Sequence, residues 1–211
     1  MEYQFIVNPQ TNRKCRTDSK LGKQIIRKYL SKIANAYNGG PVGVETLSAA
    51  LADQMSKMSI AKGKSTAAVK FAHKAIEMEE NANQKAIYYL ALADAYRNAG
   101  SYASARVEAY NALELRSGWG EAYMNLGNIY ISGAKSCGSD FDNSTVYWVA
   151  VDSFKKALSD EETKDRASKS INTYSKYFPT KEKCFFNGVE QGKSHTVGCW
   201  INKTTMARPS D

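Results

Sequence analysis

Two stretches of this chain repeat each other at an offset of 34 residues, and this repeat constrains the fold more than any other feature. The matched positions are Tyr89, Leu92, Ala93 and Tyr96 in the first copy, and Tyr123, Leu126, Gly127 and Tyr130 in the second. Apolar residues at steps of three and four predict an amphipathic helix in each copy. Gly100 ends the first helix, and the small residues Ala105 and Ala112 indicate a second, closely packed helix from about residue 102 to 115. A fixed period of this kind predicts antiparallel helix pairs that stack on one another.

The period and the repeated positions resemble the tetratricopeptide repeat (TPR), a helix-turn-helix unit of about 34 residues. The resemblance implies an all-α fold in which antiparallel helical hairpins stack as a short TPR-like solenoid, with an irregular C-terminal tail. It further implies a protein-interaction scaffold without enzymatic activity, whose partner is a protein or a peptide.

Three segments are expected along the chain. Residues 1–52 form a basic N-terminal extension, with a short strand or hairpin edge near residues 1–18 and a helix from Ser19 to Tyr37. A glycine-rich turn then precedes a second helix that carries Val44 and Leu51, and residues 54–64 either continue this helix or link it to the next. Residues 53–178 form the repeat array, and residues 179–211 form a tail that packs back on the array.

The array is expected to hold two full repeats and a partial one. A helix capped by Ser65 or Thr66 and ending at Met78 is the second helix of a repeat whose first helix is degenerate. The second full copy is interrupted by an insertion over residues 133–145, which we expect to be a loop because insertions in repeat arrays go to loops. A helical stretch that ends at Phe178 closes the array.

Four cysteines, at positions 15, 137, 184 and 199, allow three complete pairings, and the spacing alone does not choose among them. Separated motifs in the last third of the chain resemble exported TPR proteins of Bacteroidetes: Ala134 to Gly138, Tyr147 to Phe154, Tyr177 to Lys181 and Gly198 to Ile201. The resemblance implies a disulfide between Cys137 and Cys199, and a periplasmic or exported location. If the chain is complete as given, it carries no signal peptide and is expected in the cytoplasm.

The N-terminal segment is unusually basic. Residues 1–52 carry eight basic and three acidic side chains, a net charge of +5 out of +8 for the whole chain. The stretch from Gly39 to Leu51 is similar to the winged-helix region of the Holliday-junction branch-migration motor, although no phosphate-binding loop follows. Residues 1–52 are therefore interpreted as a cap on the repeat stack or, alternatively, as a nucleic-acid-binding element. The candidate nucleic-acid contacts are Lys20, Lys23, Arg27 and Lys28.

No pattern in the chain indicates catalysis. The two histidines, His73 and His195, have no nucleophile at motif spacing, and no phosphate cradle, metal cluster or cofactor fingerprint occurs. We therefore expect no cofactor and no metal. No apolar run is long enough to predict a membrane span.

The first helix of each TPR pair lines the concave groove, so polar residues on these helices are the candidate peptide-binding positions. They are Asp94, Arg97, Asn98, Glu121, Asn125, Asn128 and Ser132. Asn125 and Asn128 resemble two positions of a carboxylate clamp, but Leu90 and Met124 stand where the clamp uses lysine. The sequence therefore predicts a non-catalytic scaffold with a polar peptide groove. Two alternatives stay open: a nucleic-acid-binding element fused to a TPR recruiting module, or an engineered composite without a selected function.

Overall fold

The computed structural model describes residues 5–7, 14–16, 19–21, 23–28 and 48–210. The chain divides into two compact units, Met1–Leu47 and Ser48–Asp211. This division lies between Leu47 and Ser48, whereas the boundary expected after residue 52 lies inside a helix of the second unit.

In the first unit, two short strands pair antiparallel, as expected for the N-terminal residues. Strand β1 (Phe5–Val7) pairs with β2 (Lys14–Arg16), with Phe5 opposite Arg16. Residues 20, 21 and 23–28 are helical, in agreement with the start of the predicted helix. The rest of that helix and the glycine-rich turn lie outside the described residues.

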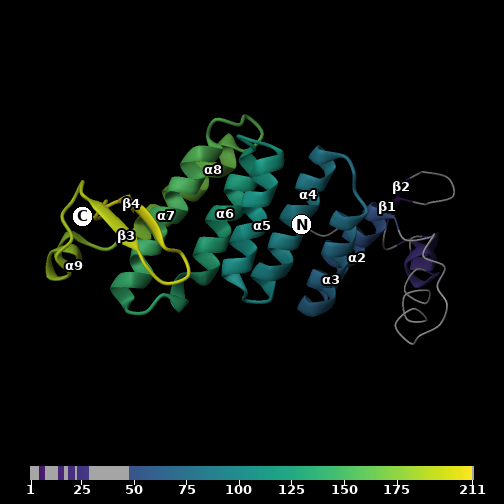
Figure 1. The fold of residues 1–211 in the computed structure, drawn as a ribbon, viewed down its shortest axis with the longest axis horizontal. Coiled ribbons are helices and arrows are strands. Elements are labelled where there is room, and N and C mark those ends of the chain that lie inside the picture. The colour runs from purple at the N-terminus through teal and green to yellow at the C-terminus, as the bar shows by residue number, and fades with distance from the viewer. Residues whose placement is uncertain (1–4, 8–13, 17–18, 22, 29–47, 211) are drawn as a thin grey trace. The chain divides into compact units, whose positions relative to one another are not determined.

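The second unit is built from helices that pack in neighbouring pairs (Figure 1). The pairs are α2 (Ala49–Ala61) with α3 (Ser65–Glu77), α4 (Ala82–Asn98) with α5 (Tyr102–Leu115), and α6 (Gly120–Gly133) with α7 (Asp140–Ala157). Helix α8 (Lys164–Tyr174) packs on α7 and closes the series. The fold is all-α, a short stack of helical hairpins, as the repeat predicted.

Helix α2 corrects the expected start of the array. Its N-cap is Ser48, whose side chain accepts a hydrogen bond from the backbone N–H of Leu51. The helix runs on through the segment to Ala61 and so supplies a complete first member of the α2/α3 pair. Ser56 of α2 is fully buried and donates a hydrogen bond to the Ala68 carbonyl of α3 over 2.8 Å. The partner helix is therefore present although it lacks the repeated aromatic pattern. A smaller correction concerns α3, whose N-cap is Lys64.

Small residues set the close approach of paired helices, as the sequence suggested. Ala105 and Ala112 of α5 are fully buried, and Gly100 ends α4 with a φ of +77°. At Gly127 of α6, an added Cβ would lie 2.3 Å from the ring of Phe154 on α7. The ring of Phe154 therefore occupies the space that a side chain at position 127 would need.

The expected loop over residues 133–145 is wrong for much of its length. A 3-10 turn, η2 (Ala134–Ser136), follows α6, and α7 already begins at Asp140. The reason is a capping box, in which Ser139 accepts from the N–H of Asp142 while the Asp142 side chain accepts from the N–H of Ser139. The insertion thus extends α7 at its N-terminus and leaves only a short connection around Cys137.

The tail folds back on the array and is more regular than expected. After the 3-10 turn η3 (Ser175–Tyr177), helix α9 (Lys181–Phe186) precedes an antiparallel hairpin of β3 (Ser194–Val197) and β4 (Lys203–Met206). Both strands pack on α7 (Figure 1). The buried Trp148 of α7 donates its indole N–H to the Arg208 carbonyl over 2.9 Å.

A disulfide joins Cys137, next to η2, to Cys199 in the hairpin turn. The neighbouring Trp200 lies between Tyr102 and Tyr130, with ring centroids 5.7 and 5.8 Å away. The hairpin turn is thus held covalently to the connection before α7 and by aromatic contacts to α5 and α6. The pairing implied by the Bacteroidetes resemblance is the one in the structure.

Candidate functional site

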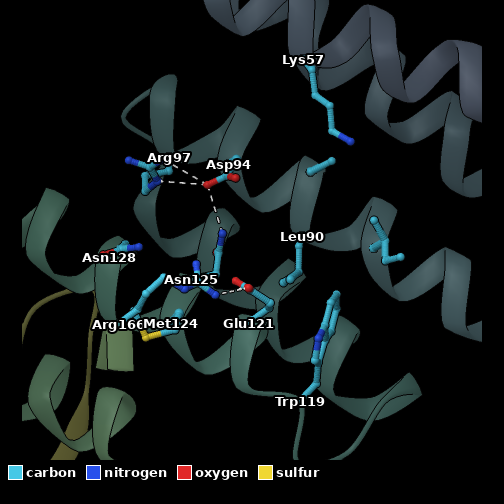
Figure 2. A pocket seen from close by; sticks show the side chains of 12 residues that line it. Lys57, Leu90, Asp94, Arg97, Trp119, Glu121, Met124, Asn125, Asn128 and Arg166 are labelled. Carbon is cyan, nitrogen blue, oxygen red and sulfur yellow. Dashed lines mark hydrogen bonds and ion pairs between the residues drawn. The ribbon is translucent and has the colours of Figure 1, made fainter. Parts of the chain in front are cut away.

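Four helices of the second unit line one pocket, with a volume of about 340 Å³. Its residues are Lys57 of α2, Ile87, Leu90, Ala91, Asp94 and Arg97 of α4, Trp119 before α6, Glu121, Met124, Asn125 and Asn128 of α6, and Arg166 of α8 (Figure 2). We call these twelve residues the groove. Helices α2, α4 and α6 are the first members of the three pairs, so the groove lies on the face that the stacked first helices share.

Asp94 is the centre of the polar wall. Its Oδ1 accepts hydrogen bonds from Arg97 Nε over 3.3 Å and Arg97 Nη2 over 3.1 Å, one turn along α4. The same oxygen accepts from Asn125 Nδ2 of α6 over 3.0 Å (Figure 2). One carboxylate oxygen therefore fixes two side chains from two repeats.

This arrangement leaves Asn125 with an unused acceptor. Because its Nδ2 donates to Asp94, the amide is oriented with Oδ1 on the other side. Oδ1 is buried, and no donor among the described residues bonds to it. A buried acceptor without a donor is unfavourable, so an incoming N–H group that reaches it gains a strong hydrogen-bonding site.

Three cations lie along the groove, from α2, α4 and α8. Arg166 forms an ion pair with Glu121, which ties α8 to α6. Lys57 donates to Asp53 Oδ2 over 2.5 Å, one turn earlier on α2. Burial raises the pKa of Asp53, although the Lys57 ammonium opposes the shift, and the second oxygen of Asp53 has no partner in the described structure. The lining itself carries three cations and two anions, a net charge of +1.

The floor of the groove is apolar. Leu90 of α4 and Met124 of α6 both contribute, and only 7% of Met124 is exposed. Trp119 forms one side, and the guanidinium of Arg116 lies over its ring, 4.5 Å from the centroid. Apolar surface beside a polar wall suits a ligand that has both kinds of group.

Five of the seven candidate groove residues line the pocket: Asp94, Arg97, Glu121, Asn125 and Asn128. The other two do not. Asn98 donates to the Asp94 carbonyl over 2.7 Å, and its own carbonyl accepts from Ser65. Ser132 is exposed near the end of α6.

Sequence reasoning missed three groove residues with distinctive chemistry: Lys57, Trp119 and Arg166. Lys57 lies on the helix that lacks the repeated pattern, and Arg166 on a helix that was expected only to close the stack. Trp119 lies directly before α6, so its side chain was not assigned to the first-helix face. Leu90 and Met124 were noted as departures from a clamp, and the structure places both in the groove floor.

The candidate nucleic-acid contacts lie in the first unit. Lys20, Lys23, Arg27 and Lys28 are all exposed on the described helical residues. They are separate from the groove in the sequence and belong to the other compact unit.

The two histidines contact aromatic side chains. His73 Nε2 is 3.0 Å from the Tyr96 hydroxyl, and His195 packs edge-on against Phe141 and Trp148. Burial lowers the pKa of His195. The described residues contain no cluster of three or more His, Cys, Asp or Glu side chains placed to hold a metal ion. Within those residues, no helix is both long and apolar enough to cross a bilayer.

Comparison with known proteins gives a structural likeness only. No protein-family model and no curated protein matches the sequence. Among solved structures, the chain is similar to the first TPR domain of Spaghetti (RPAP3) bound to the HSP90 peptide SRMEEVD, at 17% identity and a TM-score of 0.48. The match covers 61% of this chain and 93% of that domain.

The decisive observation lies in the chain itself, where Tyr89, Leu92 and Tyr96 of α4 recur on α6, and each of these helices opens an antiparallel pair. The fold is TPR-like. In TPR terms, α2, α4 and α6 are the first helices of three repeats, and α8 follows the third. The finer likenesses, to exported Bacteroidetes proteins and to a winged-helix region, stay predictions.

Proposed function

We propose that this protein is a non-catalytic scaffold that binds a peptide segment of a partner protein in the groove. The observation that carries the proposal is the pairing of Asp94 with Asn125, which leaves the buried Oδ1 of Asn125 without a donor in a groove that combines apolar and polar side chains. A peptide supplies both the backbone N–H that such an acceptor needs and side chains for the floor.

The size of the groove supports a short segment. A volume of about 340 Å³ is near the lower end of the range of roughly 300–1,000 Å³ that is typical of ligand pockets. Three repeats also give a short first-helix face, which suits a few consecutive residues of a partner.

The proposal is tested by selection from a random peptide display library on the immobilised full-length protein. Enriched peptides are then measured by fluorescence anisotropy against the native protein and Asn125→Ala. We expect the substitution to weaken binding by about tenfold, as for the loss of a buried hydrogen bond and the freeing of Asp94.

Asn111→Ala is the matched control. Asn111 lies on α5, outside the groove, and donates to Glu108 over 2.9 Å. This variant should bind the selected peptides as the native protein does. Selected peptides that bind equally well to Asn125→Ala would place their site elsewhere and contradict the proposal.

A second candidate function rests on the exposure of four basic side chains on one short helical segment. Lys20, Lys23, Arg27 and Lys28 would contact the phosphates of a nucleic acid, with an affinity that falls steeply as salt rises. Duplex binding measured at low and physiological salt tests this candidate, with Lys23→Gln combined with Arg27→Gln as the variant. Absence of binding at low salt would reject it.

A further inference from the structure

We infer that the groove selects an internal peptide segment in which a bulky apolar side chain lies next to a carboxylate. This inference rests on the proposed function and adds the chemistry of the ligand.

The floor does not suit a chain-terminal carboxylate. Leu90 and Met124 provide a methyl-rich and thioether surface at the positions where the two first helices face the pocket. A carboxylate held against these two side chains would lose water to apolar surface, which is costly, and it is better placed beside the guanidinium groups of the wall. An aliphatic or aromatic side chain gains free energy at the same place because it removes apolar surface from water. Trp119 adds an aromatic surface, and the Arg116 guanidinium stacks on its ring.

The arginines of the wall retain donors for an anion. A guanidinium carries five N–H donors. Arg97 uses its Nε and Nη2 groups on Asp94, and Arg166 uses Nη2 on Glu121. The remaining donors of Arg97 and Arg166 have no hydrogen-bond partner among the described residues. The exposed fractions of the Arg97 and Arg166 side chains are 30% and 47%, so both are accessible to a ligand.

The two carboxylates of the groove attract a basic ligand less strongly than its guanidinium groups attract an acidic ligand. Asp94 already accepts from Arg97 and Asn125, and Glu121 is paired with Arg166. The second oxygen of each carboxylate remains for a ligand ammonium, but it lies beside a guanidinium that already balances its charge. A ligand carboxylate can instead add to unused donors in a lining with a net charge of +1. Lys57 contributes a further cation at the α2 side of the groove (Figure 2).

The test uses defined pools of short fluorescent peptides that are blocked at both ends, so that they mimic an internal segment. The first pool has a central Leu flanked by Glu, with small neutral residues elsewhere. The second has Lys in place of Glu, and the third has Ser in place of Leu. The fourth repeats the first pool with a free C-terminal carboxylate. Binding to the full-length protein is measured by anisotropy.

We expect the first pool to bind about tenfold more tightly than the second and third, and the free carboxylate to add less than about twofold. Arg166→Gln should remove most of the preference for Glu over Lys. Lys169→Gln is its matched control, because it removes one positive charge from an exposed position on α8 outside the groove. Leu90→Lys combined with Met124→Lys should shift the preference towards the free carboxylate, with circular dichroism melting as the check on folding.

Equal or tighter binding of the Lys pool, or a gain of tenfold or more from the free carboxylate, would overturn the inference. If that binding is lost in Asn125→Ala, the proposed function stands and only the ligand chemistry is wrong. If none of the four pools binds but the display library yields peptides sensitive to Asn125→Ala, the inference again fails alone. If neither source gives a groove-dependent peptide, both fail.

Discussion

At the scale of single residues, Asp94 shows how two repeats are made to present one surface. Its Oδ1 holds Arg97 on its own helix and Asn125 on the next first helix. The Arg97 pair is partly exposed and is therefore worth little to folding stability. Its main effect is orientation, because it helps to hold the Asp94 carboxylate whose Oδ1 also accepts from Asn125.

Gly127 gives a test of the packing between α6 and α7. In Gly127→Ala the new Cβ would lie 2.3 Å from the buried ring of Phe154, which must move. We expect a net loss of about 2 kcal/mol of stability, since overpacking outweighs the better helix propensity of alanine. Thermal unfolding followed by circular dichroism should show a midpoint several degrees lower.

Gly198→Ala is the control for this prediction, because no atom lies within 4 Å of the Cβ that it adds. Its midpoint should match that of the native protein. A Gly127→Ala variant as stable as the control would mean that the Phe154 ring relaxes without cost, and that the close approach of α6 and α7 is not set at this position.

Groove residues could be predicted where the repeat assigns them a helix face. Asn125 and Asn128 follow from the offset of 34 residues, because that offset places them on a first helix. Lys57 and Arg166 could not be found in this way, because their helices carry no copy of the pattern. Their place depends on long-range packing of α2 and α8, and the ion pair of Arg166 with Glu121 spans 45 residues.

At the scale of elements, the repeat predicts α4, α5 and α6 well, and it predicts α2 and the start of α7 less well. The repeat does not identify helix α2, because this helix carries a buried serine and lacks the repeated aromatic pattern. The repeat predicts a loop at the start of α7 because the period breaks there. The local signal that decides it is the pair Ser139 and Asp142, which together form a capping box.

The disulfide is expected to stabilise the C-terminal elements that it joins. Replacing Cys137 and Cys199 by serine opens a loop with a sequence separation of 62. By the chain-entropy model this costs about 4 kcal/mol, or roughly 8–16 °C in midpoint for a unit of this size. Hydrogen exchange should increase mainly in β3, β4 and the first turns of α7, while the groove helices keep their protection.

Treatment of the native protein with a reductant should reproduce this shift, and the same treatment should leave the double variant unchanged. A reductant-induced loss of protection in α4 instead of the hairpin would contradict the assignment of the disulfide to the tail.

At the scale of the whole molecule, the role of the N-terminal unit stays a prediction, and the structure defines how to test it. Deletion of residues 1–52 would remove the N-cap and first turn of α2, so it would damage the array itself. Deletion of residues 1–47 keeps Ser48 and the complete helix. If the first unit is a cap, its removal should lower the thermal midpoint, because the ends of repeat stacks need covering.

Ser48→Ala in the full-length chain is a useful comparison, since it removes only the α2 cap and should cost about 1 kcal/mol. A deletion with an unchanged midpoint would reject the capping role and favour a first unit that acts independently.

The C-terminal tail changes the order in which the parts of this array unfold. In an ordinary solenoid each repeat contacts only its neighbours, so unfolding starts at either end. Here Arg106 of α5 donates to the Ile201 carbonyl, and Lys203 donates to the Tyr110 hydroxyl over 2.9 Å, contacts that span 95 and 93 residues. The β3/β4 hairpin is thus linked to α5 by hydrogen bonds and to the connection before α7 by the disulfide. Fraying should therefore proceed from α2 inwards, and the α5 to β4 portion should unfold as one cooperative block.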